Sequence, residues 1–342
     1  MIKILSSILF VALLLLASPS TAEIITKEVS FRNGEVQIFA SLLMSQDKKG
    51  KAGRPAVIMV HGSGDGPREI FLPMARWYAE QGFIVLIYDK RGSGRSGGNW
   101  QSSSLTDLAE DVVAGLSFLA GQPVVARSKI GIFGVSQAGW VLPVAVTKSE
   151  IATWAIVVTG GGVRPDKAEI FATRQQLEHA GFSSESLEQA EEVLLHYYNY
   201  LGTGQGMAEL DRAIEKFGSR PWFSLLNLRR SLLEEDDFTE NWGWVGNYDP
   251  VPFIGRSKLA WLVMLAAEDT QSNTRDAVLG WQTGFDLASN PASVLKVFPD
   301  VGHGLVVGGH DMVAHSEARE FAPGYYKTQA EWLRELGIME SK

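Results

Sequence analysis

The chain contains no cysteine, and its basic residues form no long run. Without cysteine there is no disulfide to staple the fold and no site for lipoprotein modification. A chain of 342 residues is long enough to be stabilised by an apolar core alone. The longest basic run is Lys-Lys-Gly-Lys at residues 48–51, and the formal net charge is −8. We therefore do not expect nucleic acid as a partner.

Patterns that bind metals are also missing from the sequence, which has no His-Glu-x-x-His and no cluster of histidine and aspartate. The glycines at 92, 94 and 97 match the spacing of a dinucleotide fingerprint, but such a loop opens directly into a helix. Here the polar residues 98–103 intervene. We therefore expect no metal and no cofactor.

The first 22 residues have the features of a secretory signal peptide. Lys3 gives a positive start, residues 8–17 are almost wholly apolar, and Ser20-Thr21-Ala22 supplies the small residues that a signal peptidase reads. The apolar stretch is short for a membrane span, which disfavours the alternative of an uncleaved anchor. We expect cleavage after Ala22, export to a bacterial periplasm or beyond, and no stable membrane association afterwards.

Strand patterns that alternate with helical patterns predict an α/β fold with a mostly parallel, doubly wound sheet. An Asn-Gly turn at residues 33–34, between two alternating segments, predicts an antiparallel hairpin over residues 24–43 at one edge. Further strands are predicted at residues 56–60, 83–88, 129–133, 153–158, 259–265 and 294–298. Helices are predicted at residues 71–81, 105–119, 138–148, 274–283 and 325–336.

The alternation stops between Val163 and Gly255, where no buried strand is evident. This segment has helical patterns at residues 167–180, 186–201 and 207–216, and it is rich in aromatic residues. We interpret residues 23–162 and 256–342 as one core domain and residues 163–255 as a helical cap inserted into it. The aromatic residues could line a substrate pocket or fasten the cap to the core, and the sequence favours neither.

A hexapeptide after the strand at residues 129–133 has the pattern of a nucleophile elbow. It reads Gly134-Val-Ser136-Gln-Ala138-Gly, and a helical pattern follows it. A tight turn between strand and helix strains the serine backbone and needs small neighbours two positions away on each side. Gly134 and Ala138 are both small, although glycine is usual at the second position. Ser136 is the predicted nucleophile.

A serine hydroxyl needs a base and an acid, which an elbow of this type meets at the ends of later strands, acid first. Glu268 and Asp269 follow the strand at residues 259–265, and His303 follows the strand at residues 294–298. Since the carboxyl ends of parallel strands share one edge, these loops should converge on Ser136.

Each partner has an alternative in the sequence. Asp269 is favoured over Glu268 as the acid because it is shorter and lies further beyond the strand. His303 is favoured as the base over His310 and His315, which lie in polar, glycine-rich sequence that is not attached to a strand.

Acyl transfer also requires donors for the developing oxyanion, usually backbone amides. One should be the amide of Gln137, next to the nucleophile. The second normally lies after the third strand, in the loop at residues 61–66, and we assign it to Ser63 or an immediate neighbour. His61 in this loop is expected to shape the backbone rather than to act as a base.

Five motifs in this order resemble those of the α/β-hydrolase fold across nearly the whole chain after the leader. They are His61-Gly62 after strand three, the turn at residues 89–96 after strand four, the elbow, and the acid and histidine loops. The turn at residues 89–96 is similar to those of bacterial secreted esterases and peptidase-like serine hydrolases. The resemblance implies a triad of Ser136, Asp269 and His303 and a cap at residues 163–255.

These residues predict a serine hydrolase that cleaves small carboxylic esters through an acyl-enzyme intermediate. Cleavage of amides or peptides by the same triad is the first alternative. A non-catalytic binding protein on the same fold is the second, and it is disfavoured because a binder has no need of all three residues.

Overall fold

A computed structural model of the chain describes residues 23–48, 53–229, 231, 233, 236–290, 292–307 and 320–340. The predicted leader at residues 1–22, His310 and His315 lie outside these described residues. The described part contains one mostly parallel sheet with strand order β1-β2-β4-β3-β5-β6-β7-β8. Its strands are β1 (Ile24–Asn33), β2 (Val36–Ser45), β3 (Arg54–Val60), β4 (Ile84–Tyr88), β5 (Val125–Val135), β6 (Trp154–Val158), β7 (Ala260–Ala266) and β8 (Val294–Phe298).

Helices fill most of the connections between these strands. They are α1 (Leu72–Glu80), α2 (Leu105–Ala120), α3 (Ala138–Lys148), α4 (Pro165–His179), α5 (Ser184–Thr203), α6 (Met207–Phe217), α7 (Asp236–Trp242), α8 (Trp244–Asn247), α9 (Val251–Gly255), α10 (Thr274–Ala288) and α11 (Tyr325–Glu335). Short 3₁₀ turns add η1 (Gln46–Lys48), η2 (Arg68–Phe71), η3 (Trp100–Ser102) and η4 (Phe223–Leu226).

The first two strands form the predicted hairpin at the edge of the sheet. Asn33 pairs with Val36 across the turn, and Gly34 takes the left-handed conformation with φ of 53°, which glycine adopts without steric cost. β2 then pairs antiparallel with β4, and every later pairing is parallel. The loops at the carboxyl ends of the parallel strands β3 to β8 therefore lie along one edge of the sheet.

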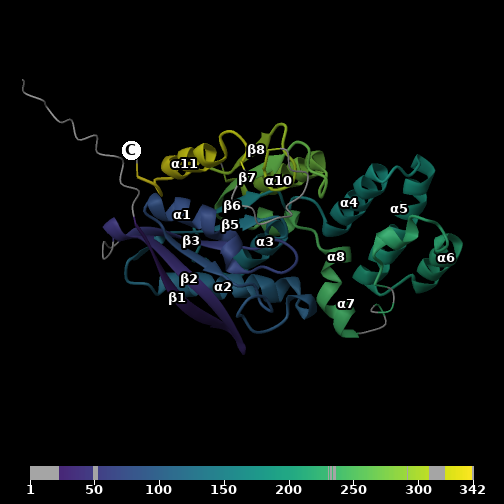
Figure 1. The fold of residues 1–342 in the computed structure, drawn as a ribbon, viewed down its shortest axis with the longest axis horizontal. Coiled ribbons are helices and arrows are strands. Elements are labelled where there is room, and N and C mark those ends of the chain that lie inside the picture. Colours follow the sequence, from purple (N-terminus) through teal and green to yellow (C-terminus); the bar gives the residue numbers. More distant parts are fainter. Residues whose placement is uncertain are drawn as a thin grey trace, which may run out of the picture.

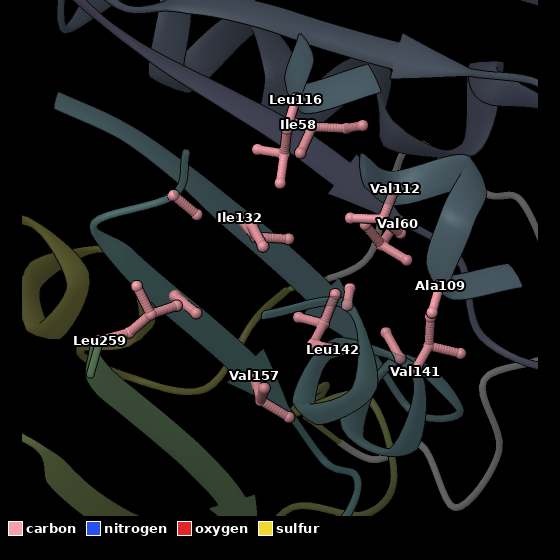
Figure 2. Packing of buried hydrophobic residues seen from close by; sticks show 14 of the residues in the cluster. Ile58, Val60, Ala109, Val112, Leu116, Ile132, Val141, Leu142, Val157 and Leu259 are labelled. Atoms are coloured by element: carbon pink, nitrogen blue, oxygen red, sulfur yellow. The ribbon is translucent and has the colours of Figure 1, made fainter. Parts of the chain in front are cut away.

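The interior strands are buried on both faces, which explains their continuous apolar sequences. Along β4, Ile84 and Leu86 face one apolar cluster while Val85 and Ile87 face the other. The first cluster lies under α2, α3 and α10, and the second lies under α1 and α11. Figure 2 shows part of the first cluster, where side chains of α2 and α3 meet those of β3, β5 and β6.

Between β6 and β7 the chain leaves the sheet and forms α4 to α9. In Figure 1, α4, α5, α6 and α7 lie together at one end of the molecule, beyond the sheet. Side chains of α4, α5, α6 and α8 build an apolar cluster of their own that includes Leu177 and Tyr197, and Trp222, just before η4, belongs to it as well. This is the segment for which the sequence predicts a cap. Among the described residues, no helix is both long and apolar enough to cross a bilayer.

The predicted fold class is confirmed, and most predicted elements lie within a few residues of their observed bounds. β5 begins at Val125, four residues before its predicted start. The sequence does not indicate this start, because several of the first residues of the strand are exposed and polar and form no continuous apolar run. The short helices α7, α8 and α9 were not predicted, since seven or fewer residues show no helical period.

Candidate active site

Ser136 lies in a strained turn between β5 and α3. Its φ of 53° places a non-glycine residue in the left-handed region, and its amide donates a hydrogen bond to the carbonyl of Val158 at 2.9 Å. A Cβ atom added to Gly134 would lie 2.6 Å from the Cβ of Ala138. The turn therefore requires glycine at 134 but accommodates alanine at 138, which explains the departure from the usual elbow pattern.

A continuous chain of hydrogen bonds links the three residues that the sequence predicts as a triad. Nε2 of His303 lies 2.9 Å from Oγ of Ser136, and Nδ1 lies 2.8 and 3.0 Å from the two carboxylate oxygens of Asp269. A carboxylate can only accept, so Nδ1 carries the proton and Nε2 accepts from the serine hydroxyl. The ring is thus held in the tautomer that can remove a proton from Ser136.

Asp269 and Glu268 point to different surroundings. Asp269 is 8% exposed, and its Oδ1 also accepts hydrogen bonds from the amides of Gln271 and Ser272 at 2.7 and 3.1 Å. Glu268 is exposed, and its backbone amide donates to the carbonyl of Val301. Of the two carboxylates that the sequence offered, the structure brings only Asp269 into contact with His303.

The loop that carries His303 is fixed on both sides. The amide of Gly304 donates to Oγ1 of Thr159 at 3.2 Å, and the amide of Leu305 donates to the carbonyl of Gly302 at 3.0 Å. Thr159, which directly follows β6, has φ of 48° and so shares with Ser136 the strained left-handed conformation. His303 is 6% exposed, so the position of its ring is set by packing as well as by its hydrogen bonds to Ser136 and Asp269.

The two predicted oxyanion donors belong to loops that lie against the nucleophile. Gln137 precedes α3, and Ser63 lines the same cavity as Ser136 and His303. A Cβ atom on Gly62 would lie 3.1 Å from the Cβ of Ser136, so the Ser63 loop packs directly on the elbow. Within the described residues, neither the Gln137 amide nor the Ser63 amide donates a hydrogen bond.

His61 does not contact the triad. Its Nε2 donates to the carbonyl of Tyr88 at 2.6 Å, and its ring packs against Phe71 with a centroid distance of 4.7 Å. Burial, the main cause, lowers the pKa of His61 to about 4, and nearby Lys90 acts in the same direction. A Cβ atom on Gly66 would lie 2.7 Å from this ring, so the histidine shapes the loop that presents Ser63.

A cavity of about 290 Å³ opens over Ser136 between the sheet and α4. Glu169 and Ala172 of α4 contribute to its wall, and Trp140 of α3 donates from its indole Nε1 to the carbonyl of Val163 at 2.8 Å. The residues lining the cavity are Ser63, Ser136, Trp140, Thr159, Gly160, Gly161, Glu169, Ala172, Gln271, Ser272 and His303.

Several of these residues were missed by sequence reasoning. Glu169 lies in a polar stretch of α4 that carries no recognisable motif, and Trp140 reads as one more apolar residue of a buried helix. Thr159 follows β6 directly, so its place at the end of a parallel strand was a usable signal. Among the described residues, no group of three or more His, Cys, Asp or Glu could hold a metal ion.

Comparison with known proteins extends these observations. A model of the family described as X-Pro dipeptidyl-peptidase (S15 family) matches residues 18–205, more than half of the chain. Polyketide transferase af380 of Aspergillus fumigatus is 36% identical over 107 residues, which cover 31% of this chain and 36% of the transferase. Esterase EstD of Thermotoga maritima is 23% identical over 274 residues, which cover 76% of this chain and 57% of EstD. The chain therefore spans about a third of the transferase and little more than half of EstD.

Among solved structures, the α/β-hydrolase GrgF from Penicillium sp. sh18 is similar with a TM-score of 0.54 and 19% identity. The alignment covers 92% of this chain and 97% of GrgF. At this identity the likeness establishes the fold, and it confirms the predicted α/β-hydrolase architecture.

Proposed function

The chain belongs to the X-Pro dipeptidyl-peptidase (S15) family of serine hydrolases, and on that premise we propose that it cleaves carboxylic esters through an acyl-enzyme intermediate. The observation that carries this proposal is the unbroken chain of hydrogen bonds from Asp269 through His303 to Ser136. In this proposal Ser136 is the nucleophile, His303 the general base and Asp269 the residue that orients the base.

The geometry supports the following steps. Oγ of Ser136 attacks the ester carbonyl carbon while Nε2 of His303 accepts its proton, and Asp269 stabilises the imidazolium that forms. The carbonyl oxygen becomes an oxyanion and accepts hydrogen bonds from the amides of Gln137 and Ser63. When the tetrahedral intermediate collapses, His303 returns the proton to the leaving alcohol and an ester to Ser136 remains. Water, activated by His303, then releases the acid by the same steps in reverse order.

Relatives favour two different leaving groups. EstD is an esterase by name, which supports an ester substrate, whereas the family model that matches is named for a dipeptidyl-peptidase, which supports an amide. Amide hydrolysis by the same residues is therefore the second candidate function. The two differ in the leaving group that His303 must protonate and share all other steps.

The test is covalent labelling of the purified protein with a fluorophosphonate probe, beside the Ser136→Ala variant. We expect the wild type to label at one site, mapped by mass spectrometry to Ser136, and the variant to remain unlabelled. Equal labelling of both proteins would refute the assignment of the nucleophile. A panel of 4-nitrophenyl esters and matched 4-nitroanilides then compares kcat/KM for ester and amide with the same acyl group.

The proposed location of the enzyme rests on the leader alone. We propose that residues 1–22 direct export to the periplasm or beyond and are removed after Ala22, so that the mature enzyme acts on small ester substrates without a stable membrane attachment. N-terminal sequencing of the protein from a fractionated bacterial host tests this. A mature chain that begins at Glu23 supports the proposal, and retention of Met1 in the membrane fraction contradicts it.

A further inference from the structure

Lys90 lies behind the proposed oxyanion site with its ammonium group enclosed by protein. It follows β4 in the turn at residues 89–96 and is 3% exposed. Nζ donates to the carbonyl of Gly62 at 2.8 Å, to the carbonyl of Gly64 at 3.2 Å and to Oε1 of Gln137 at 2.9 Å. An ammonium group has three donors and no acceptor, so these three oxygens use its whole hydrogen-bonding capacity.

The bond to Gly62 controls the orientation of one predicted oxyanion donor. The carbonyl of Gly62 and the N–H of Ser63 belong to the same peptide unit, and in a trans peptide they point in opposite directions. Fixing the carbonyl on Nζ therefore turns the N–H of Ser63 away from Lys90, toward the cavity that Ser63 and Ser136 line. The positive charge also polarises this peptide and strengthens its N–H as a donor.

The bond to Gln137 holds the residue that carries the other donor. The Gln137 side chain is 3% exposed, and Lys90 donates to its amide oxygen. Its backbone N–H stands at the start of α3 beside Ser136. A single ammonium group thus bridges the loop of Ser63 and the elbow of Gln137, two segments that are far apart in sequence.

We propose that Lys90 is a positioning residue that sets the distance and orientation of the two oxyanion donors, the amides of Ser63 and Gln137. This inference rests on the proposed function, because it assigns Lys90 a task only in acyl transfer. Lys90 does not touch the substrate, and the backbone bond from its amide to the carbonyl of Gly66 at 2.8 Å would survive a change of side chain. A substitution therefore tests the ammonium group itself.

The central variant is Lys90→Met, which keeps the unbranched stem as far as Cε and removes the ammonium group with its three donors. Donors that are displaced from the oxyanion lose stabilisation of the transition state but not of the bound substrate. We expect kcat to fall about 100-fold while KM changes less than threefold. Lys148→Met is the matched control, since this exposed lysine pairs with Glu110 far from the cavity and should keep wild-type activity.

A second readout separates positioning from general damage to the fold. A trifluoromethyl ketone forms a tetrahedral adduct whose oxyanion occupies the oxyanion site, whereas the matching amide of the same shape binds without forming one. In Lys90→Met the affinity for the ketone should fall in proportion to kcat/KM, and the affinity for the amide should stay within threefold. Equal losses for both ligands, or unchanged kcat, would overturn the proposal.

The Gln137→Met variant decides the matter if Lys90→Met does not fold. It removes one of the three partners of Nζ and leaves the backbone donor of residue 137 in place. We expect a fall in kcat with little change in KM. Wild-type kcat in Gln137→Met would contradict a bridge through this side chain.

The two proposals fail in different ways. If the wild type does not react with a fluorophosphonate, the proposed hydrolase function is wrong. If the wild type reacts and turns over esters while Lys90→Met equals it in kcat, the proposed function stands and only the role of Lys90 is wrong.

Discussion

Nδ1 of His303 lies 2.8 Å from the carboxylate of Asp269, although Glu268 is the first acidic residue after β7. The chain turns after the strand so that the side chain of residue 268 faces solvent and that of residue 269 faces the histidine loop. The amides of Gln271 and Ser272 complete the surroundings of the aspartate. Glu268 and Asp269 carry the same functional group and differ in whether it contacts His303. Mutating each in turn therefore tests the contact with His303 rather than the presence of a carboxylate.

The Asp269→Asn and Glu268→Gln variants should differ sharply in activity. An asparagine at 269 can donate to Nδ1, which favours the wrong tautomer of His303, so we expect kcat to fall about 10⁴-fold with little change in shape. Glu268→Gln should retain activity within about twofold because the side chain is exposed. Steady-state hydrolysis of a 4-nitrophenyl ester measures both. Similar losses in the two variants would show that the acid has been misassigned.

The glycine after Thr159 is predicted to be intolerant of any side chain. A Cβ atom on Gly160 would lie 1.9 Å from the carbonyl oxygen of Ser136, a backbone atom that cannot move away without displacing the nucleophile. We expect Gly160→Ala to lower the free energy of unfolding by about 3 kcal/mol and to slow fluorophosphonate labelling. Gly97→Ala is the control, because its nearest neighbour would be 3.7 Å away. Urea unfolding and the rate of fluorophosphonate labelling are measured for both variants. If Gly160→Ala and Gly97→Ala do not differ in either quantity, the close packing at Gly160 is wrong.

The activity of the wild type should decline on the alkaline side. Burial, opposed by the nearby carboxylates of Asp65 and Asp111, lowers the pKa of Lys90 to about 8. His61, which also lies close to Lys90, is neutral throughout this range. The three-donor form of Lys90 is the protonated one, so kcat/KM should fall as the pH rises through about 8. The Lys90→Met variant should lack this alkaline limb, and a limb of equal size in both proteins would assign it to another group.

Stability should fall in acid because of His61. Burial lowers the pKa of this imidazole from 6.5 to about 4, so the unfolded chain takes up the proton first as the pH drops. The contribution of neutral His61 to the free energy of unfolding is therefore fully present above about pH 6.5 and is lost progressively toward pH 4. The total loss over this range is roughly 3 kcal/mol. Urea unfolding at pH 7 and pH 4.5 measures the loss.

The matched variant for this titration is His61→Gln, whose amide can still donate to the carbonyl of Tyr88. It cannot titrate, so its loss of stability between the two pH values should be smaller than that of the wild type by about 2 kcal/mol or more. An identical pH dependence in the two proteins would show that other groups cause the acid effect.

The places of Ser136, Asp269 and His303 could be predicted because each follows a strand of a parallel sheet. Strand ends of such a sheet meet at one edge, so topology alone brings distant residues together. The direction of each side chain could not be predicted in the same way. Lys90 lies in a turn without periodicity, and only the folded structure shows that its ammonium group turns inward between two loops.

The segment at residues 163–255, which the sequence predicts to be a cap, was harder to predict in detail for a related reason. α4, α5 and α6 have long helical patterns, but α4 is polar on several sides, and its sequence does not show that Glu169 faces the cavity. The short helices α7 to α9 owe their form to packing rather than to local preference. Of the two roles that the sequence left open for the aromatic residues of this segment, the structure shows contact with the core, because Trp244 of α8 packs against Trp140 of α3 with a centroid distance of 6.0 Å. Among the described residues, no aromatic residue of the segment 163–255 lines the cavity, and the aromatic side chain in its wall is Trp140 of α3.

The apolar cluster shared by α4, α5, α6 and α8 has a consequence for substitutions in these helices. The residues of α4, α5 and α6 in this cluster do not belong to the cluster under the sheet, so substitutions among them should leave the packing of the sheet largely unchanged. α4 nevertheless supplies part of the wall above Ser136. Substitutions in α4 can therefore change the wall of the cavity above Ser136 while the strand-end loops keep their sequence.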